Sequence, residues 1–394
     1  MKRLKGVLYT SVGLALGLSA CGPSATSQAT TQPAAAMVAL STPTIQVATV
    51  TTAPTSAPTI APTIDPSKSR MEKGQITSAA LTGNLIGDSP TKNYIVYLPP
   101  GYDTSGKSYP VVYGIHWGGG NEGWWPAKAV ESTMNSLIAD HSVRDMIMVF
   151  PDASNAFEYS WCDSSPTIGD YDGYISKDLV SLVDSKYRTL ASSDSRGIMG
   201  CSMGGTCALH LAFRHPDIFG IAVPMSWKLV DYEHDPETAA QLKQFEFEPQ
   251  TLNGFGRLNF YPHIAVGLAA IAASNPNKPP LYLDQPIRII GGKPAFVPEV
   301  FEKILQLDPR VDVEQYLSQP VRLKGLLLYA DNGKWWTFDP NMINNWQFVQ
   351  KTDNEFDRLL TKRGIQHEFM RADVPHCDQD YIPALKFLDE HLVH

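Results

Sequence analysis

Residues 196–205 read RGIMGCSMGG, and this stretch decides the fold. A short apolar run leads into a G-x-S-x-G motif, and helical spacing continues from Met203 to Phe213. The glycines at positions 200 and 204 allow a sharp turn, because side chains there would clash with the neighbouring strand and helix. Such a turn holds a strained serine at a helix N-terminus, where N–H groups favour a developing negative charge. The motif predicts that Ser202 is a nucleophile; a plain glycine-rich turn is the alternative.

Strand-like and helix-like segments alternate along most of the chain. Apolar runs predict strands at residues 76–81, 94–98, 111–116, 146–150, 196–200, 221–225, 325–330 and 367–370. Helical spacing occurs at residues 173–187, 203–213, 354–363 and 382–392. This alternation is typical of a mostly parallel central sheet flanked by helices on both faces. We therefore expect an α/β-hydrolase fold, with the G-x-S-x-G turn at the carboxyl end of a central strand.

The alternation stops between residues 228 and 320. This stretch is rich in aromatic residues and prolines, and it precedes the strand predicted at residues 325–330. We expect it to be an insertion that caps the site; a peripheral extension remote from the chemistry is the alternative.

The N-terminal residues indicate export. A basic start and an apolar stretch end in Leu18-Ser19-Ala20-Cys21, which resembles a bacterial lipobox. We expect a signal peptide at residues 1–20, lipidation of Cys21, and a disordered linker rich in Thr, Ser, Pro and Ala at residues 21–73. The catalytic domain would then occupy residues 74–394, lipid-anchored at the bacterial cell surface or on the outer face of the membrane. An ordinary signal peptide with a coincidental cysteine is the alternative.

Charge and composition limit the partners. The net charge of −8 leaves no basic stripe for nucleic acid. We expect contact with a membrane only through the N-terminal lipid anchor. The His and Cys residues show no metal-ligand spacing, so neither a metal nor another cofactor is implied.

Two further segments fit acyl-transfer chemistry. The run Ile115 to Asn121, which contains Gly118-Gly119-Gly120, follows a predicted strand and could supply an oxyanion donor. We assign the two oxyanion N–H groups to Gly118 and Met203, and we interpret His116 as structural. His376 lies after a strand and before the last helix, where the general base is expected. A loop histidine packed against that helix is the alternative.

The acid that orients the base is harder to choose. It should follow the strand at residues 325–330, where Asp331 and Asp339 are both available. Asp331 also fits a plain Asp-Asn-Gly turn. Asp339 lies further into the loop, and we favour it, with Asp331 as the alternative.

The cysteine positions suggest two disulfides. With Cys21 lipidated, four cysteines remain, an even number in a chain expected to be exported. Cys201 directly precedes the expected nucleophile and Cys377 directly follows the expected base. If Ser202 and His376 meet, these cysteines are close enough to bridge, which leaves Cys162 and Cys207 as the second pair. Buried free thiols are the alternative.

Most tryptophans follow predicted strands at their carboxyl ends, where the site opens. We expect Trp117, Trp161 and Trp227 to line the substrate pocket, where aromatic side chains suit an aromatic acyl group or sugar faces. Packing between loops and cap is the alternative for each.

Several motifs together resemble the esterase D / feruloyl esterase-like group of α/β hydrolases. They are Phe150-Pro151-Asp152, Tyr171–Ile175, Asp184–Thr189, Arg196–Gly205 and His215–Phe219. The resemblance covers the chain from about Tyr94 onward and implies carboxylic ester hydrolysis, often of acyl groups on plant polysaccharides. Cys201-Ser202 with His376-Cys377 is similar to the disulfide-linked triad of tannases and fungal feruloyl esterases.

The chain departs from the group at two places. His116-Trp117 replaces the usual His-Gly of the oxyanion loop, and the segment from Asp331 to Trp336 replaces the usual Gly-x-x-Asp. The acid is therefore not implied by the resemblance.

The expected function is two-step acyl transfer from an ester to water through a Ser-His-Asp triad. Esters of carbohydrates, acyl or feruloyl, are the expected substrates. An acyltransferase to a cell-surface acceptor and a non-catalytic binding protein on a hydrolase scaffold are the alternatives.

Overall fold

The computed structural model describes residues 65, 67–227, 245–332, 334 and 346–394. The expected signal peptide, the lipidation site Cys21 and nearly all of the linker lie outside these residues. None of the helices in the described part of the chain is long and apolar enough to cross a bilayer.

The strands form one large sheet and two small hairpins. The sheet strands are β1 (Arg70–Thr77), β2 (Thr91–Leu98), β3 (Val111–Ile115), β4 (Ile147–Pro151), β7 (Arg196–Cys201), β8 (Ile221–Met225), β11 (Gly325–Ala330) and β12 (Glu368–Arg371). Their order is β1-β2-β4-β3-β7-β8-β11-β12, antiparallel at β1, β2 and β4 and parallel from β4 to β12. The two hairpins are β5 (Ser164–Ser165) with β6 (Gly169–Asp170), and β9 (Ile287–Ile290) with β10 (Lys293–Phe296).

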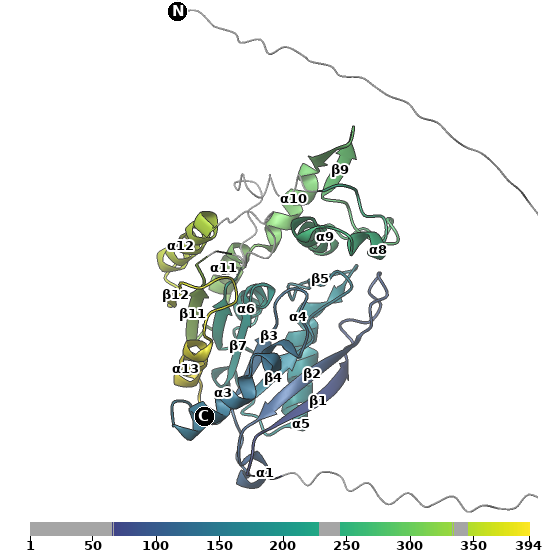
Figure 1. The fold of residues 1–394 in the computed structure, drawn as a ribbon. Helices are drawn as coiled ribbons and strands as arrows, with labels where there is room; N and C mark the ends of the chain where they lie inside the picture. The colour runs from purple at the N-terminus through teal and green to yellow at the C-terminus, as the bar shows by residue number, and fades with distance from the viewer. Residues whose placement is uncertain (1–64, 66, 228–244, 333, 335–345) are drawn as a thin grey trace, which may run out of the picture. The chain divides into compact units, whose positions relative to one another are not determined.

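Helices connect the strands. They are α1 (Tyr102–Ser105), α2 (Trp124–Ala127), α3 (Val130–Ala139), α4 (Tyr171–Gly173), the π-helical η1 (Tyr174–Leu179), α5 (Val180–Lys186), the 3₁₀ turn η2 (Ser193–Ser195), α6 (Met203–Arg214), α8 (Leu252–Phe255), α9 (Phe260–Ala272), α10 (Pro298–Ile304), the 3₁₀ turn η3 (Leu305–Leu307), α11 (Pro309–Ser318), α12 (Trp346–Lys362) and α13 (Ile382–His391). The α/β-hydrolase architecture expected from the alternation is confirmed (Figure 1).

Alternation within each strand divides the core into two layers. In β3, Val111 and Tyr113 join one apolar cluster and Val112 joins the other, because successive side chains point to opposite faces. Helix α6 packs in the first layer, and α3 and α13 pack in the second. The central strands are therefore buried on both faces, which explains their continuous apolar runs.

The first strand begins earlier than expected. The sequence predicts a strand at residues 76–81 and a domain start at Gly74, whereas β1 runs from Arg70 to Thr77 and pairs with β2 along its whole length. Arg70 and Glu72 make β1 polar, as is common in strands at a sheet edge. An apolar pattern therefore could not reveal this strand.

The insertion forms a separate layer of secondary structure. Figure 1 shows α8, α9, α10 and β9 together beyond one end of the large sheet. Ser165 Oγ donates to the carbonyl oxygen of Ala270 in α9 at 2.8 Å, and Thr167 Oγ1 lies 2.7 Å from Ser274 Oγ. Residues 228–244 of the insertion are outside the described part.

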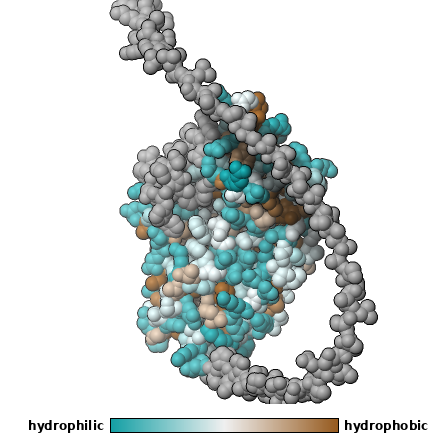
Figure 2. Space-filling model, turned by 45° about the vertical axis from the view of Figure 1, so that its right-hand side comes forward, coloured by the Kyte–Doolittle hydropathy of each residue, from teal (hydrophilic) through white to brown (hydrophobic). Residues whose placement is uncertain are grey.

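The exposed surface of the described residues has only scattered large apolar side chains. Ile290, Phe296, Val311, Met370 and Val393 are the exposed ones, and they lie on different elements. On the face seen in Figure 2, brown patches are separated by hydrophilic surface. Single exposed apolar residues of this kind are common on soluble domains.

Candidate active site

Ser202 lies on the sharp turn between β7 and α6. Its backbone has φ 59° and ψ −118°, a conformation that a non-glycine residue rarely adopts. The Ser202 N–H donates to the carbonyl oxygen of Met225 at 3.0 Å, which fixes the turn against the end of β8. The local sequence permits this because a Cβ on Gly200 would lie 2.3 Å from the backbone of Gly204.

The start of α6 also touches the end of β3. A Cβ on Gly204 would lie 2.4 Å from the carbonyl oxygen of Ile115, so only glycine allows this approach. Met203 is the first residue of α6, where N–H groups have no intrahelical acceptor. The structure thus brings the two segments that carry the predicted oxyanion donors, Met203 and Gly118, next to each other.

His376 is paired with Asp331. The Nδ1 atom of His376 lies 2.7 Å from Oδ2 of Asp331, and both side chains are buried, 3% and 1% exposed. A carboxylate at this distance accepts the Nδ1 proton, so Nε2 is the basic nitrogen of the ring. The His376 N–H donates to the carbonyl oxygen of Lys334 at 2.8 Å and holds the loop after β12 to the loop after β11.

The pairing bears on the choice of acid. Asp331 directly follows β11, and Arg371 donates to its carbonyl oxygen at 2.7 Å. Asp339, which the sequence favours, lies outside the described residues. The structure therefore places the alternative, Asp331, beside His376.

A disulfide joins Cys201, the last residue of β7, to Cys377, with the two Cα atoms 5.9 Å apart. Because these cysteines adjoin Ser202 and His376, the bridge ties the serine turn after β7 to the histidine loop after β12. Cys377 N–H also approaches Ser226 Oγ, at 3.4 Å.

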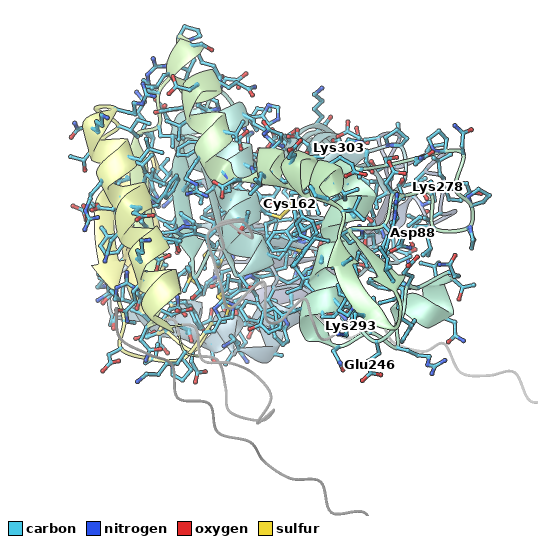
Figure 3. The ribbon with its side chains drawn as sticks, turned by 90° about the horizontal axis from the view of Figure 1, so that it is seen from above. Asp88, Cys162, Glu246, Lys278, Lys293 and Lys303 are labelled. Carbon is cyan, nitrogen blue, oxygen red and sulfur yellow. A yellow bond between two sulfur atoms is a disulfide. The ribbon has the colours of Figure 1, made fainter. Side chains whose placement is uncertain are left out.

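The second disulfide joins Cys162 to Cys207, with the Cα atoms 5.1 Å apart. Cys207 lies in α6, so this bridge ties the loop containing Trp161 to the helix that begins at the serine. Figure 3 shows Cys162 deep inside the domain beneath the insertion.

The loop that contains Gly118, the predicted oxyanion donor, is held by a tyrosine that the sequence does not reveal. A Cβ on Gly118 would lie 2.0 Å from Cε1 of Tyr159, so the tyrosine ring rests directly on Gly118. The same ring stacks on Trp161 with centroids 6.1 Å apart and meets His263 of α9 edge-on at 5.8 Å. The only sequence signal is the glycine itself, which indicates close approach but not by which residue.

His116 has the structural role that the sequence suggests. Its Nδ1 donates to the carbonyl oxygen of Trp117 at 2.6 Å, and its Nε2 accepts from the Ala153 N–H at 2.9 Å. Burial lowers the pKa of His116 and favours the neutral ring that both bonds require. The ring joins the oxyanion loop to the loop after β4.

Of the three tryptophans expected at the pocket, only Trp117 is partly exposed. Trp161 and Trp227 are buried. Trp227 packs on Phe356 of α12, with ring centroids 6.2 Å apart. Both indole N–H groups are buried without a hydrogen-bond acceptor among the described residues.

A buried ionic network crosses from the nucleophile helix to the insertion. Arg214, at the end of α6, donates to Asp312 of α11 at 3.0 Å and to Asp163 at 3.1 Å. His210, one turn earlier, pairs through Nδ1 with the same Asp312 carboxylate. His210 and Arg214 are four residues apart and share a helix face, a spacing visible in the sequence, but their partners are remote along the chain.

Contacts at the end of α6 lower the pKa of two buried carboxyl groups. Burial acts to raise the pKa of Asp312, but the contacts with His210 and Arg214 outweigh it and lower the pKa. Asp172 is lowered in pKa in the same way: burial opposes the shift, and a bond to His215 at 2.6 Å favours it. These pairs join α6 to α11 and to α4, and so fix the insertion beside the helix that begins at Ser202.

Comparison with known proteins shows that the chain is similar to esterases. Residues 90–254 match the model of the family described as "Putative esterase". An endo-1,4-beta-xylanase/feruloyl esterase of Xylanibacter ruminicola is 31% identical over 153 residues, 37% of this chain and 21% of that protein. An esterase of Mycobacterium tuberculosis is 34% identical over 141 residues, 35% of this chain and 29% of that protein. The matched segments are less than a third of these relatives.

Solved structures show the same fold. A ferulic acid esterase superposes with a TM-score of 0.55 at 18% identity, covering 82% of this chain and 99% of that one. An S-formylglutathione hydrolase of Staphylococcus aureus superposes with a TM-score of 0.50 at 14% identity, over 82% and 99% of the two chains. With the strained serine turn and the sheet order, these matches confirm the expected resemblance: the chain has an α/β-hydrolase fold and is similar to esterases.

Proposed function

We propose that the protein is a carboxylic ester hydrolase whose catalytic residues are Ser202, His376 and Asp331. The observation that carries the proposal is that the Cys201–Cys377 disulfide joins the turn that bears Ser202 to the loop that bears His376. The turn is strained and lies at the N-terminus of α6, and His376 forms a buried pair with Asp331. An acid beside His376 argues against a scaffold that has lost its catalytic function.

The reaction would proceed through an acyl-enzyme. Ser202 Oγ attacks the ester carbonyl while His376 Nε2 takes its proton, and the Asp331 carboxylate stabilises the resulting imidazolium. The backbone N–H groups of Met203 and Gly118 would bind the oxyanion. His376 then passes the proton to the departing alkoxide, and the same steps with water release the acid and restore the serine.

Esters of carbohydrates are the proposed substrates. Support comes from the names of a sequence relative, the endo-1,4-beta-xylanase/feruloyl esterase, and of a structural neighbour, the ferulic acid esterase. Both names give a feruloyl or ferulic acid ester as the substrate, and the first also names a xylanase, an enzyme that acts on a polysaccharide.

Hydrolysis of p-nitrophenyl acetate, methyl ferulate and acetylated xylan by the full chain tests the proposal. Ser202→Ala should abolish turnover on every ester that the wild type cleaves, whereas Ser185→Ala, an exposed serine on α5, should leave it unchanged. Turnover that survives in Ser202→Ala, or no turnover by the wild type on any ester, would count against the proposal.

The proposed location is the outer side of the bacterial membrane, with Cys21 lipidated. The two disulfides support an oxidising compartment, since such bridges are rare in the cytosol. Incorporation of labelled palmitate in the wild type but not in Cys21→Ser is the expected result. Equal labelling of the two would refute the anchor.

A further inference from the structure

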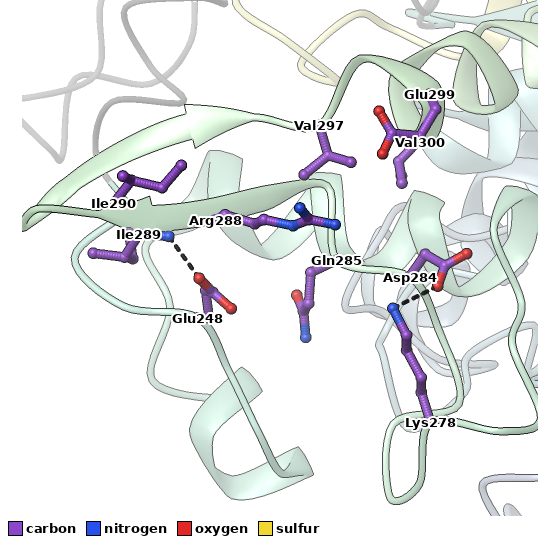
Figure 4. A pocket seen from close by; sticks show the side chains of 10 residues that line it. All are labelled: Glu248, Lys278, Asp284, Gln285, Arg288, Ile289, Ile290, Val297, Glu299 and Val300. Atoms are coloured by element: carbon purple, nitrogen blue, oxygen red, sulfur yellow. Dashed lines mark hydrogen bonds and ion pairs between the residues drawn. The ribbon is translucent and has the colours of Figure 1, made fainter.

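A polar cavity lies in the insertion, at the base of the β9–β10 hairpin. Its volume is about 350 Å³, near the lower end of the range for small-molecule sites. Figure 4 shows Gln285 and Arg288 projecting into it, with Val297 and Val300 as apolar wall. None of the predicted catalytic, oxyanion or tryptophan residues lines it.

One side of the cavity presents a fixed carboxylate. Asp284 accepts from Asn275 Nδ2 at 2.7 Å and from Lys278 Nζ at 2.8 Å, and Lys303 Nζ lies 3.8 Å from its other oxygen. Figure 3 shows Lys278 and Lys303 on the same side of the domain. Although burial opposes it, these bonds lower the pKa of Asp284, so the group stays a charged acceptor.

Two other polar groups in the cavity have unused bonding capacity. Gln285 Nε2 donates to the carbonyl oxygen of Pro249 at 2.7 Å, which orients the amide, while its Oε1 is buried and accepts no bond from the described residues. The Arg288 side chain is exposed, and its guanidinium makes no ion pair or hydrogen bond within the described part of the chain. A buried acceptor without a donor is costly, and a ligand hydroxyl would satisfy it.

The lining selects the class of ligand. Three carboxylates (Glu248, Asp284 and Glu299) face two cations (Lys278 and Arg288), a balance of −1 that disfavours an anion. A purely apolar ligand would leave these charged groups without polar partners. A neutral polyhydroxyl ligand fits, because each hydroxyl donates to a carboxylate or to Gln285 Oε1 and accepts from Arg288 or Lys278.

We propose that this cavity binds a neutral sugar unit of the polymer that carries the ester. The inference rests on the proposed function, since it supplies a second contact for the substrate away from the reacting bond. Contacts made equally in the ground and transition states lower KM and leave kcat unchanged.

Binding is measured directly by calorimetry with xylotetraose and cellotetraose, and with glucuronic acid as the charged comparison. The full-length wild type should bind at least one neutral oligosaccharide, and Arg288→Ala should weaken that binding about tenfold or more, as loss of a charged hydrogen bond does. Lys293→Ala is the matched control, because Lys293 is an exposed cation on β10 outside the cavity lining. It should bind as the wild type does.

Kinetics separate this inference from the proposed function. Arg288→Ala should raise KM on acetylated xylan about tenfold and leave both kcat and turnover of p-nitrophenyl acetate unchanged. No binding of either neutral oligosaccharide, equal binding by wild type and Arg288→Ala, or binding of glucuronic acid alone would each overturn the sugar site. Any of these results with Ser202-dependent turnover of p-nitrophenyl acetate would leave the proposed function intact.

Discussion

Replacing Asp331 with asparagine tests which carboxylate orients the catalytic base. The Nδ1–Oδ2 distance of 2.7 Å and the burial of both side chains mean that no solvent can replace the lost charge. An asparagine amide can donate to Nδ1, which would force the ring proton onto Nε2 and leave no base facing the serine. In a triad of this type the change lowers kcat about 10⁴-fold.

That factor corresponds to about 5.5 kcal/mol of transition-state stabilisation, at 1.36 kcal/mol for each tenfold. The assay is kcat for p-nitrophenyl acetate in Asp331→Asn and in Asp339→Asn, with circular dichroism to verify folding. We expect the large loss in Asp331→Asn and a near-normal kcat in Asp339→Asn. The reverse result would show that the acid is the residue favoured by the sequence and would refute the reasoning from this geometry.

Three further predictions follow from the same contacts. Gly118→Ala places a methyl group 2.0 Å from the Tyr159 ring, so the loop must move and kcat should fall about 10²- to 10³-fold. The control Gly123→Ala, at a position with φ −82°, should keep the wild-type kcat. An unchanged kcat in Gly118→Ala would remove Gly118 from the oxyanion site. The Cys201–Cys377 disulfide closes a loop with a sequence separation of 176 residues, and the Cys201→Ala/Cys377→Ala variant should lose about 5 kcal/mol of unfolding free energy in urea titrations. The Cys162–Cys207 disulfide closes a loop with a separation of 45 residues, and the Cys162→Ala/Cys207→Ala variant should lose about 4 kcal/mol. No loss in either variant would contradict the disulfides. Asp312→Asn should lose about 3–5 kcal/mol at pH 7. In the folded state the pKa of Asp312 is below its ordinary value of 3.8. Its contribution to the unfolding free energy is therefore full above about pH 3.8 and is lost as pH falls through the folded-state pKa, so the unfolding free energies of wild type and variant should converge in acid. A constant difference between the two from about pH 7 to about pH 3 would contradict this.

The fold and the sharp turn at Ser202 could be predicted because their signals are local. The glycines around Ser202 are required by contacts within one strand–turn–helix unit, and the apolar strands are buried on both faces. The edge strand β1 begins before the predicted strand, because its first half contains Arg70, Glu72 and Lys73 and has no apolar run. The π-helical η1 was expected as ordinary helix, since residues 173–187 keep helical spacing.

The rest of the site depends on contacts between distant segments. Asp331 and Asp339 both follow β11, and only the position of His376, on another loop, distinguishes them. Tyr159 lies in a loop without periodicity, and its role comes from the close approach of Gly118. Asp312 is 102 residues from His210, so the ionic network could not be read from spacing.

In the proposed reaction Ser202 is the nucleophile that becomes acylated. The most direct measurement is intact-protein mass spectrometry after incubation with a fluorophosphonate, followed by peptide mapping, on the wild type and on Ser202→Ala. We expect one adduct on the peptide that contains Ser202 and none in the variant. An unmodified wild type, or an adduct on another residue that persists in Ser202→Ala, would contradict it.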